Sequence, residues 1–192
     1  MSSASRPLAY AFWHWKRSEV APASYEARQR DFQAALAAGK PAGFLGGTTV
    51  RLTGASWAGD GGVAYEDWYL VRDMAALESL NSAAVTAGRA APHDAVASLA
   101  AGGIAGLYGL RHGAPLAPPA FSAWFAKPAG MSYPSLDAAL APLLHAGASA
   151  LWSRRMTLGP TPEFCLQSLV RRELPDGFAA QHLALEPVWS SG

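Results

Sequence analysis

Residues 8–113 alternate between short aromatic segments with a two-residue repeat and longer segments with helical spacing. Four segments are rich in the aromatic and β-branched residues that favour strands, namely residues 8–16, 43–52, 63–71 and 108–113. Two segments carry apolar side chains at helical spacing, namely residues 25–39 and 73–85, and Asp73 is placed to cap the second of them. The predicted order is therefore strand, helix, strand, strand, helix, strand.

This order is that of the split βαβ, or ferredoxin-like, unit, which belongs to the α+β class. In such a unit the first and third strands are central neighbours, and the second and fourth lie at the edges. We therefore expect residues 8–16 to lie beside residues 63–71. The long apolar run of residues 95–110 contains four glycines and is too short to span a bilayer, so we interpret it as a buried helix that leads into a strand.

The remainder of the chain resembles a shortened copy of this unit. Residues 9–16 align with residues 120–127, with Trp13 on Trp124, and a proline-rich connector precedes the second copy. The helix before the last strand of this copy is nearly absent from the pattern. The sequence thus predicts two tandem ferredoxin-like halves, 1–113 and 114–192, whose antiparallel sheets form an α/β-barrel-like arrangement.

Three segments, AYAFWHWK, AYEDWYLVRDMAALESLN and GLYGLRHG, carry a resemblance to the dimeric α/β-barrel superfamily. That superfamily includes antibiotic-biosynthesis-type monooxygenases, EthD-like proteins and chlorite-dismutase-like haem proteins. The resemblance covers most of the chain in element order and matches no catalytic signature. It implies a barrel that binds a small hydrophobic or aromatic molecule in its interior, with cofactor-independent oxidation or isomerisation as the accompanying chemistry.

Composition excludes several other classes of protein. The chain is 51% hydrophobic and 15% charged, unlike a disordered polypeptide, and its net charge of +1 gives no footprint for nucleic acid or an anionic membrane. Cys165 is the single cysteine, which excludes an internal disulfide and a cysteine-rich metal site. No signal peptide or membrane span is recognisable, so we expect a cytoplasmic protein that contacts neither membrane nor nucleic acid.

The first strand suggests a functional site. Strand alternation places Tyr10, Phe12 and His14 on one face, with Trp13 and Trp15 on the other. An aromatic surface that contains a histidine suits proton transfer on a phenol- or quinone-like molecule. We expect His14 to accept the proton and no cofactor or metal to be needed.

The strand at residues 63–71 supplies the rest of the predicted site. Asp67 would be the polar partner of His14, while Tyr65 and Tyr69 would complete the cavity wall inside the barrel. Glu66 must face the opposite side of the sheet from Asp67, so the two carboxylates cannot act jointly. His112 is a further predicted ligand-binding residue, and it shares a strand face with Leu110 and Tyr108.

Three alternatives stay open from the sequence. The aromatic face would be ordinary core packing if its histidine is simply hydrogen-bonded. A haem protein would use His112, His145 or His14 as its axial ligand. A structural or interaction module would have a fully filled barrel, and an edge left open by the shortened second half would favour a homodimer.

Overall fold

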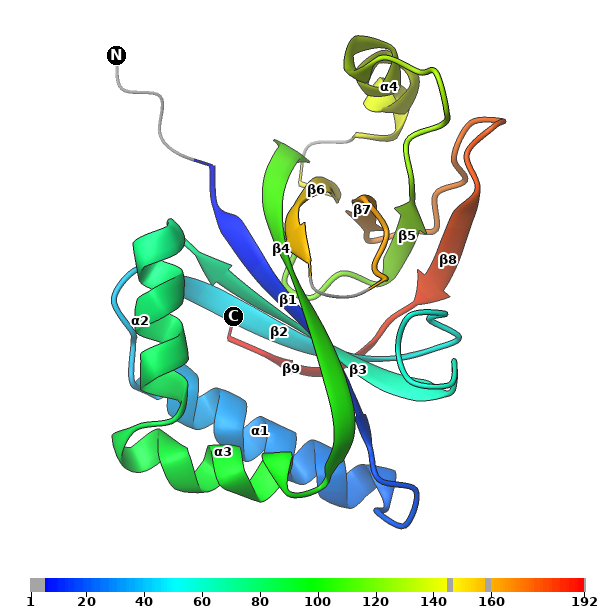
Figure 1. Ribbon diagram of the computed structural model, residues 1–192. Coiled ribbons are helices and arrows are strands. Elements are labelled where there is room, and N and C mark those ends of the chain that lie inside the picture. The colour runs from blue at the N-terminus through cyan, green and yellow to red at the C-terminus, as the bar shows by residue number, and fades with distance from the viewer. Residues whose placement is uncertain (1–5, 145–146, 158–159, 192) are drawn as a thin grey trace.

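The computed structural model describes residues 6–144, 147–157 and 160–191 (Figure 1). The strands in these ranges are β1 (Leu8–Lys16), β2 (Phe44–Thr53), β3 (Val63–Val71), β4 (Ala100–Gly113), β5 (Phe121–Phe125), β6 (Ser149–Thr157), β7 (Phe164–Ser168), β8 (Ala180–Ala184) and β9 (Glu186–Ser190). The helices are α1 (Pro22–Ala38), α2 (Met74–Ala84), α3 (Ala90–Ala97) and α4 (Tyr133–Leu140), with short 3₁₀ turns at Ala87–Arg89 and Ala141–Leu143.

All described strands join one antiparallel sheet in the order β8-β5-β7-β6-β4-β1-β3-β2-β9. The first four strands of the chain lie in the order β4-β1-β3-β2, so β1 and β3 are central neighbours as predicted. The next four repeat that order as β8-β5-β7-β6. The α+β architecture of two tandem ferredoxin-like halves is therefore confirmed.

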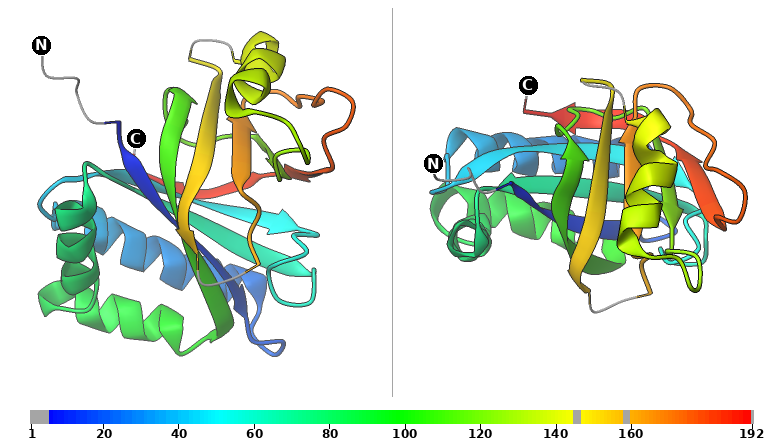
Figure 2. Two further views of the ribbon diagram at one scale, coloured as in Figure 1. Left: turned by 45° about the horizontal axis from the view of Figure 1, so that its top comes forward. Right: turned by 90° about the horizontal axis from the view of Figure 1, so that it is seen from above.

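The sheet curls into a nearly closed barrel (Figure 2). The two halves meet where β4 pairs with β6, and they approach each other again through the C-terminal strands. Leu185 alone separates β8, which pairs with β5, from β9, which pairs with β2. One sheet thus crosses the predicted boundary at residues 113–114, and the two units 1–113 and 114–192 stay a prediction.

Helices cover the outside of this barrel. Figure 1 shows α1, α2 and α3 against the outer face of the first four strands, and α4 beside the second half. The Asp73 carboxylate accepts a hydrogen bond from the Ala76 amide at 2.9 Å, so it caps α2 as predicted. The long apolar run is confirmed as a helix, α3, that leads into a strand, β4. No helix in the described ranges is long and apolar enough to cross a membrane.

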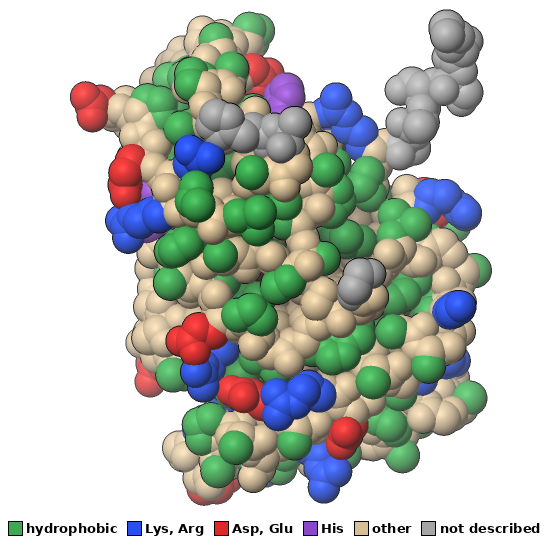
Figure 3. Space-filling view, turned by 180° about the vertical axis from the view of Figure 1, so that it is seen from behind, with side chains coloured by type: hydrophobic (Ala, Val, Ile, Leu, Met, Phe, Trp, Pro, Cys, Tyr) green, Lys and Arg blue, Asp and Glu red, His purple; other side chains and the backbone are tan. Residues whose placement is uncertain are grey.

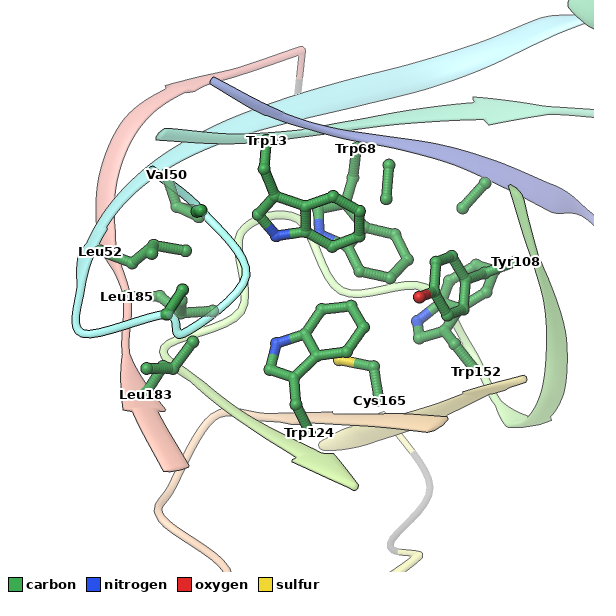
Figure 4. Packing of buried hydrophobic residues seen from close by; sticks show 14 of the residues in the cluster. Trp13, Val50, Leu52, Trp68, Tyr108, Trp124, Trp152, Cys165, Leu183 and Leu185 are labelled. Atoms are coloured by element: carbon green, nitrogen blue, oxygen red, sulfur yellow. The ribbon is translucent and has the colours of Figure 1, made fainter. Parts of the chain in front are cut away.

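Tryptophan rings fill the inside of the barrel (Figure 4). The buried rings are those of Trp13, Trp57, Trp68, Trp124 and Trp152, which pack beside Tyr108. Neighbouring tryptophan rings have centroids 5.2–6.2 Å apart, which is the spacing of favourable aromatic contacts. The predicted ligand site inside the barrel is therefore wrong in its location, because these side chains occupy that space.

The surface matches the small net charge. On the face that Figure 3 shows, basic and acidic side chains alternate, with hydrophobic side chains between them. Several opposite charges pair directly, as Arg51 does with Glu186 and Arg72 does with Asp73. Cys165 is fully buried, and burial raises the pKa of its thiol well above the ordinary value, as suits an unreactive core residue.

Candidate functional site

The predicted site residues of β1 and β3 lie together on the helix-covered face of the sheet. Opposite one another across these two strands are three pairs, namely Tyr10 and Tyr69, Phe12 and Asp67, and His14 and Tyr65. The alternation that the sequence predicted is therefore present. Its assignment to the inside of the barrel was inverted, since the Trp13 face points inward and the His14 face points toward α1, α2 and α3.

A cavity of about 320 Å³ lies between this face and the three helices. Its floor is formed by Tyr10, Phe12, His14, Asp67 and Tyr69. Apolar side chains of the helices form its walls, among them Phe32 and Leu36 of α1, Leu80 of α2 and Val96 of α3. The exposed residues Asn81, Val85 and Ala97 also line the cavity, so it opens to solvent near the ends of α2 and α3.

His14 is held at the floor of the cavity by contacts on all sides. Its ring stacks on Phe12 and on Tyr65, with centroids 5.4 Å and 5.6 Å away. Its Nε2 atom lies 3.3 Å from Oδ2 of Asp67, although the side chain is only 2% exposed. The imidazole and the carboxylate therefore form a buried pair with one orientation.

Asp67 is a buried carboxylate with a full set of donors. The Thr49 hydroxyl donates to Oδ1 at 2.6 Å, while the Gln29 amide and the Tyr69 hydroxyl donate to Oδ2 at 2.7 Å and 2.8 Å. A buried carboxyl group needs such partners, and these three side chains supply them. The cavity floor thus presents an acidic side chain whose two oxygens both accept hydrogen bonds.

Tyr25 and Gln29 of α1 complete the site, and the sequence analysis did not find their roles. The Tyr25 hydroxyl lies 2.7 Å from Nδ1 of His14, and Nε2 of Gln29 lies 3.1 Å from Nε2 of His14. Both residues line the cavity. The available signal was polar side chains at four-residue spacing, Tyr25, Gln29 and Gln33, which share one face of the helix with the apolar Phe32 and Leu36.

The tyrosines around Asp67 stay protonated at neutral pH. Burial raises the pKa of Tyr25, Tyr69 and Tyr10, and the negative charge of Asp67 raises each of them further. Burial and the nearby Glu26 carboxylate raise the pKa of Tyr65 to about 12. These phenols therefore act as neutral hydrogen-bond donors toward Asp67, His14 or a ligand.

His112 does not belong to this site. A β-bulge interrupts the pairing of β4 with β6 between Leu110 and His112, which breaks the predicted alternation. As a result Nε2 of His112 lies 3.3 Å from the Asp137 carboxylate of α4, outside the barrel, beside the Arg111–Asp137 ion pair. His112 therefore lies away from this cavity, and its binding of a ligand stays a prediction.

The two described histidines proposed as haem ligands, His14 and His112, both have protein partners. Both ring nitrogens of His14 have protein partners, His112 is paired with Asp137, and His145 lies outside the described residues. Within the described ranges no cluster of His, Cys, Asp or Glu side chains could hold a metal ion. His93, by contrast, lines the cavity without having been predicted, and its ring packs edge-on against Phe32.

Glu66 points into the barrel, as strand alternation requires. Its carboxylate accepts hydrogen bonds from the indole N–H of Trp13, at 2.6 Å, and from that of Trp68. It is fully buried, and burial raises its pKa to about 7. Glu66 and Asp67 therefore serve two separate environments, as predicted.

Comparison with known proteins gives a fold and no sequence family. No family model matches the chain, and no curated protein matches it. The "putative monooxygenase" of Fusobacterium nucleatum subsp. nucleatum ATCC 25586 superimposes with a TM-score of 0.67 at 10% identity, covering 98% of this chain and 95% of that one. That of Lactobacillus acidophilus NCFM gives a TM-score of 0.60 at 9% identity, with coverage of 96% and 95%. A "putative chlorite dismutase" gives 0.52 at 9% identity, with coverage of 96% of each chain.

The chain has the fold of the dimeric α/β-barrel superfamily. One chain supplies both sets of four strands, β4-β1-β3-β2 and β8-β5-β7-β6. The cavity belongs to the first half, where three helices cover the sheet, and the barrel interior belongs to both. The fold places this cavity between helices and sheet, while its chemistry depends on the residues described above.

Proposed function

We propose that the chain binds a small, mostly apolar aromatic molecule in the cavity between β1, β3 and the three helices, and that His14 accepts a proton from it. The observation that carries this proposal is the buried His14–Asp67 pair, with its 3.3 Å contact, at the floor of a 320 Å³ cavity. A histidine oriented by a carboxylate is a common arrangement for proton transfer.

The size and lining of the cavity support this ligand class. Small-molecule pockets commonly measure about 300–1,000 Å³, so a volume of about 320 Å³ suits a molecule of one or two fused rings. Aromatic and aliphatic side chains make most of the lining, and few polar groups face it. A compact aromatic ring system with one hydroxyl group fits this surface.

The proton would move through Tyr25. We assign the proton of neutral His14 to Nε2, the atom that faces Asp67, so Nδ1 accepts from the Tyr25 hydroxyl. The ligand hydroxyl gives its proton to the Tyr25 oxygen as Tyr25 gives its own to Nδ1. The imidazolium that forms is then stabilised by the Asp67 carboxylate. Return of the proton to a ring carbon gives the keto isomer of the ligand. In the oxidation, one dioxygen accepts four electrons from the ligand anion, so that one oxygen atom enters the ring as the second carbonyl of a quinone and the other leaves as water.

The alternatives receive less support. No described histidine among those proposed for haem has a free ring nitrogen at the cavity. A filled barrel, which a structural module would have, is present, but the cavity lies outside it. A homodimer stays a prediction.

Binding is tested first by native mass spectrometry of the freshly purified protein, and then by calorimetric titration with 2-naphthol. We expect a bound mass that denaturation releases, or saturable binding of 2-naphthol, and the same spectra report whether the chain is a dimer. Ala97→Trp fills the mouth of the cavity and should weaken binding at least tenfold. Ala91→Trp, on an exposed position of α3 outside the lining, is the matched control and should bind like the wild type.

The proton step is tested with 4-nitrophenol, whose anion is yellow. Bound 4-nitrophenol should ionise at a lower pH in the wild type than in His14→Ala, because only the wild type supplies the acceptor. If no ligand binds, or if His14→Ala and Asp67→Ala both leave affinity and colour unchanged, the assignment of this site is wrong.

A further inference from the structure

We propose that the cavity takes up its ligand in an uncharged form that carries a hydroxyl group, and that it rejects carboxylates and other organic anions. This inference rests on the proposed function and names the ligand class of the same site. It follows from which charged and polar groups face the cavity.

The described residues that line the cavity include a carboxylate and no Lys or Arg. The titratable groups that line it are Tyr10 and His14 of β1, Asp67 and Tyr69 of β3, Tyr25 of α1, and His93 of α3. Among the described residues of the lining there is no Lys or Arg. Arg89, on the turn between α2 and α3, donates to the Ala83 carbonyl at 2.5 Å and is not part of the lining.

An anion would therefore meet a buried carboxylate in a lining whose described residues include no Lys or Arg. Asp67 is 1% exposed, so little solvent screens it from a ligand at the floor. The phenols of Tyr25, Tyr69 and Tyr10 experience the same surroundings, and burial together with Asp67 raises the pKa of each. A ligand that enters as a phenolate would meet the same surroundings, which disfavour its charge.

A neutral hydroxyl, in contrast, finds partners. Tyr10 lines the cavity, and among the described residues its hydroxyl makes no side-chain hydrogen bond, so it can donate to a ligand oxygen. The Tyr25 oxygen, which lies 2.7 Å from Nδ1 of His14, has a remaining lone pair that can accept the ligand's proton. One hydroxyl group can use both partners, while a carboxylate has no proton to donate.

Uptake of the protonated form is compatible with the transfer to His14. The complex contains one ionisable proton from the ligand, whether that proton stays on the ligand or moves to the imidazole. Affinity must therefore fall as the free phenol ionises, regardless of which atom holds the proton in the complex. The colour of bound 4-nitrophenol shows whether the proton has left the ligand in the complex. The pH dependence of its affinity shows whether the ligand enters the cavity together with its proton.

The first experiment compares 2-naphthol with 2-naphthoate at pH 7 by calorimetry on the full chain. The two molecules share a ring system, and only the second is an anion at this pH. We expect the wild type to bind 2-naphthol at least tenfold more tightly, and the preference to shrink at least threefold in Asp67→Asn. Equal or tighter binding of 2-naphthoate by the wild type would overturn the inference while leaving the pocket itself established.

The second experiment needs no variant and so does not depend on Asp67→Asn folding. Binding of 4-nitrophenol to the wild type is titrated across the pH range in which the free phenol ionises, with 4-nitrobenzyl alcohol as the non-ionising control. The ratio of the two affinities should fall tenfold for each pH unit above the midpoint of the phenol. A constant ratio would contradict selection of the neutral form, whereas a failure of both ligands and of 2-naphthol to bind would contradict the proposed function instead.

Discussion

Glu66 is the residue whose surroundings depart most from those of an ordinary carboxylate. It sits among the tryptophan rings of the barrel with two indole N–H donors, and burial raises its pKa from the ordinary 4.5 to about 7. A pKa raised in the folded state means that its contribution to stability is complete below about pH 4.5 and is lost as the pH rises through 7. The shift corresponds to roughly 3 kcal/mol, from about 1.4 kcal/mol per pKa unit.

We therefore expect the free energy of unfolding of the wild type to fall between pH 5 and pH 8. In Glu66→Gln this fall should be smaller by roughly 3 kcal/mol, because the amide does not titrate. Urea denaturation at several pH values measures both slopes. Asp137→Asn, at a partly exposed ion pair, serves as the control for general charge effects. Identical slopes in the wild type and Glu66→Gln would show that Glu66 does not titrate in this range.

Tyr25 is the second residue with a prediction of its own. Tyr25→Phe removes the hydroxyl that bonds to His14 Nδ1 and keeps the ring that packs on Tyr65. We expect a loss of about 1–3 kcal/mol in the free energy of unfolding, because a buried imidazole nitrogen is left without a partner. Tyr133→Phe, whose exposed hydroxyl bonds to Glu163, is the matched control and should lose less than about 0.5 kcal/mol. A loss as small as that of the control would contradict this role of the Tyr25 hydroxyl.

Among the elements, the close approach of β4 to β1 depends on glycine. A methyl group on Gly103 would lie 2.5 Å from Cζ of Phe12 and 3.0 Å from the carbonyl oxygen of Trp13. Gly103→Ala should therefore displace Phe12, a residue of the cavity floor, and cost about 1–3 kcal/mol of stability as an overpacked contact does. Thermal denaturation checks this value, with Gly88→Ala as the control because nothing lies within 4 Å of that position. If Gly103→Ala and Gly88→Ala were equally stable, β4 would not approach Phe12 and Trp13 as closely at position 103 as the structure shows.

The predicted and observed bounds of the strands show which features of an element the sequence pattern can predict. Residues 8–16 and 63–71 match β1 and β3, because unbroken alternation between turn signals defines a strand at both ends. The bulge between Leu110 and His112 could not be foreseen, since it lies in the pairing of β4 with β6, beyond the last pair of β4 with β1 at Gly109. It turns His112 away from the barrel interior, which Tyr108 and Leu110 face.

At the scale of the molecule, β9 completes the barrel by pairing with β2. Deleting residues 186–192 would leave β2 as an exposed edge, so we expect a loss of about 3 kcal/mol, from several ladder hydrogen bonds at about 1 kcal/mol each, together with association of the chain. Urea denaturation and light scattering measure the two effects. Glu186→Gln removes only the exposed ion pair with Arg51 and should cost less than about 1 kcal/mol. A monomeric truncated chain of unchanged stability would show that β9 is dispensable.

The sequence by itself determined the order of the elements and which side chains share a strand face. Alternation put His14 with Tyr10 and Phe12, and Asp67 with Tyr65 and Tyr69, because a strand has only two faces. Only the tertiary structure decided which face the helices cover, and hence that the cavity lies outside the barrel. The tertiary structure also placed Tyr25 and Gln29 of α1 beside His14. Contacts between a helix and a sheet depend on the angle and position at which the helix crosses the strands, and no local sequence pattern encodes these.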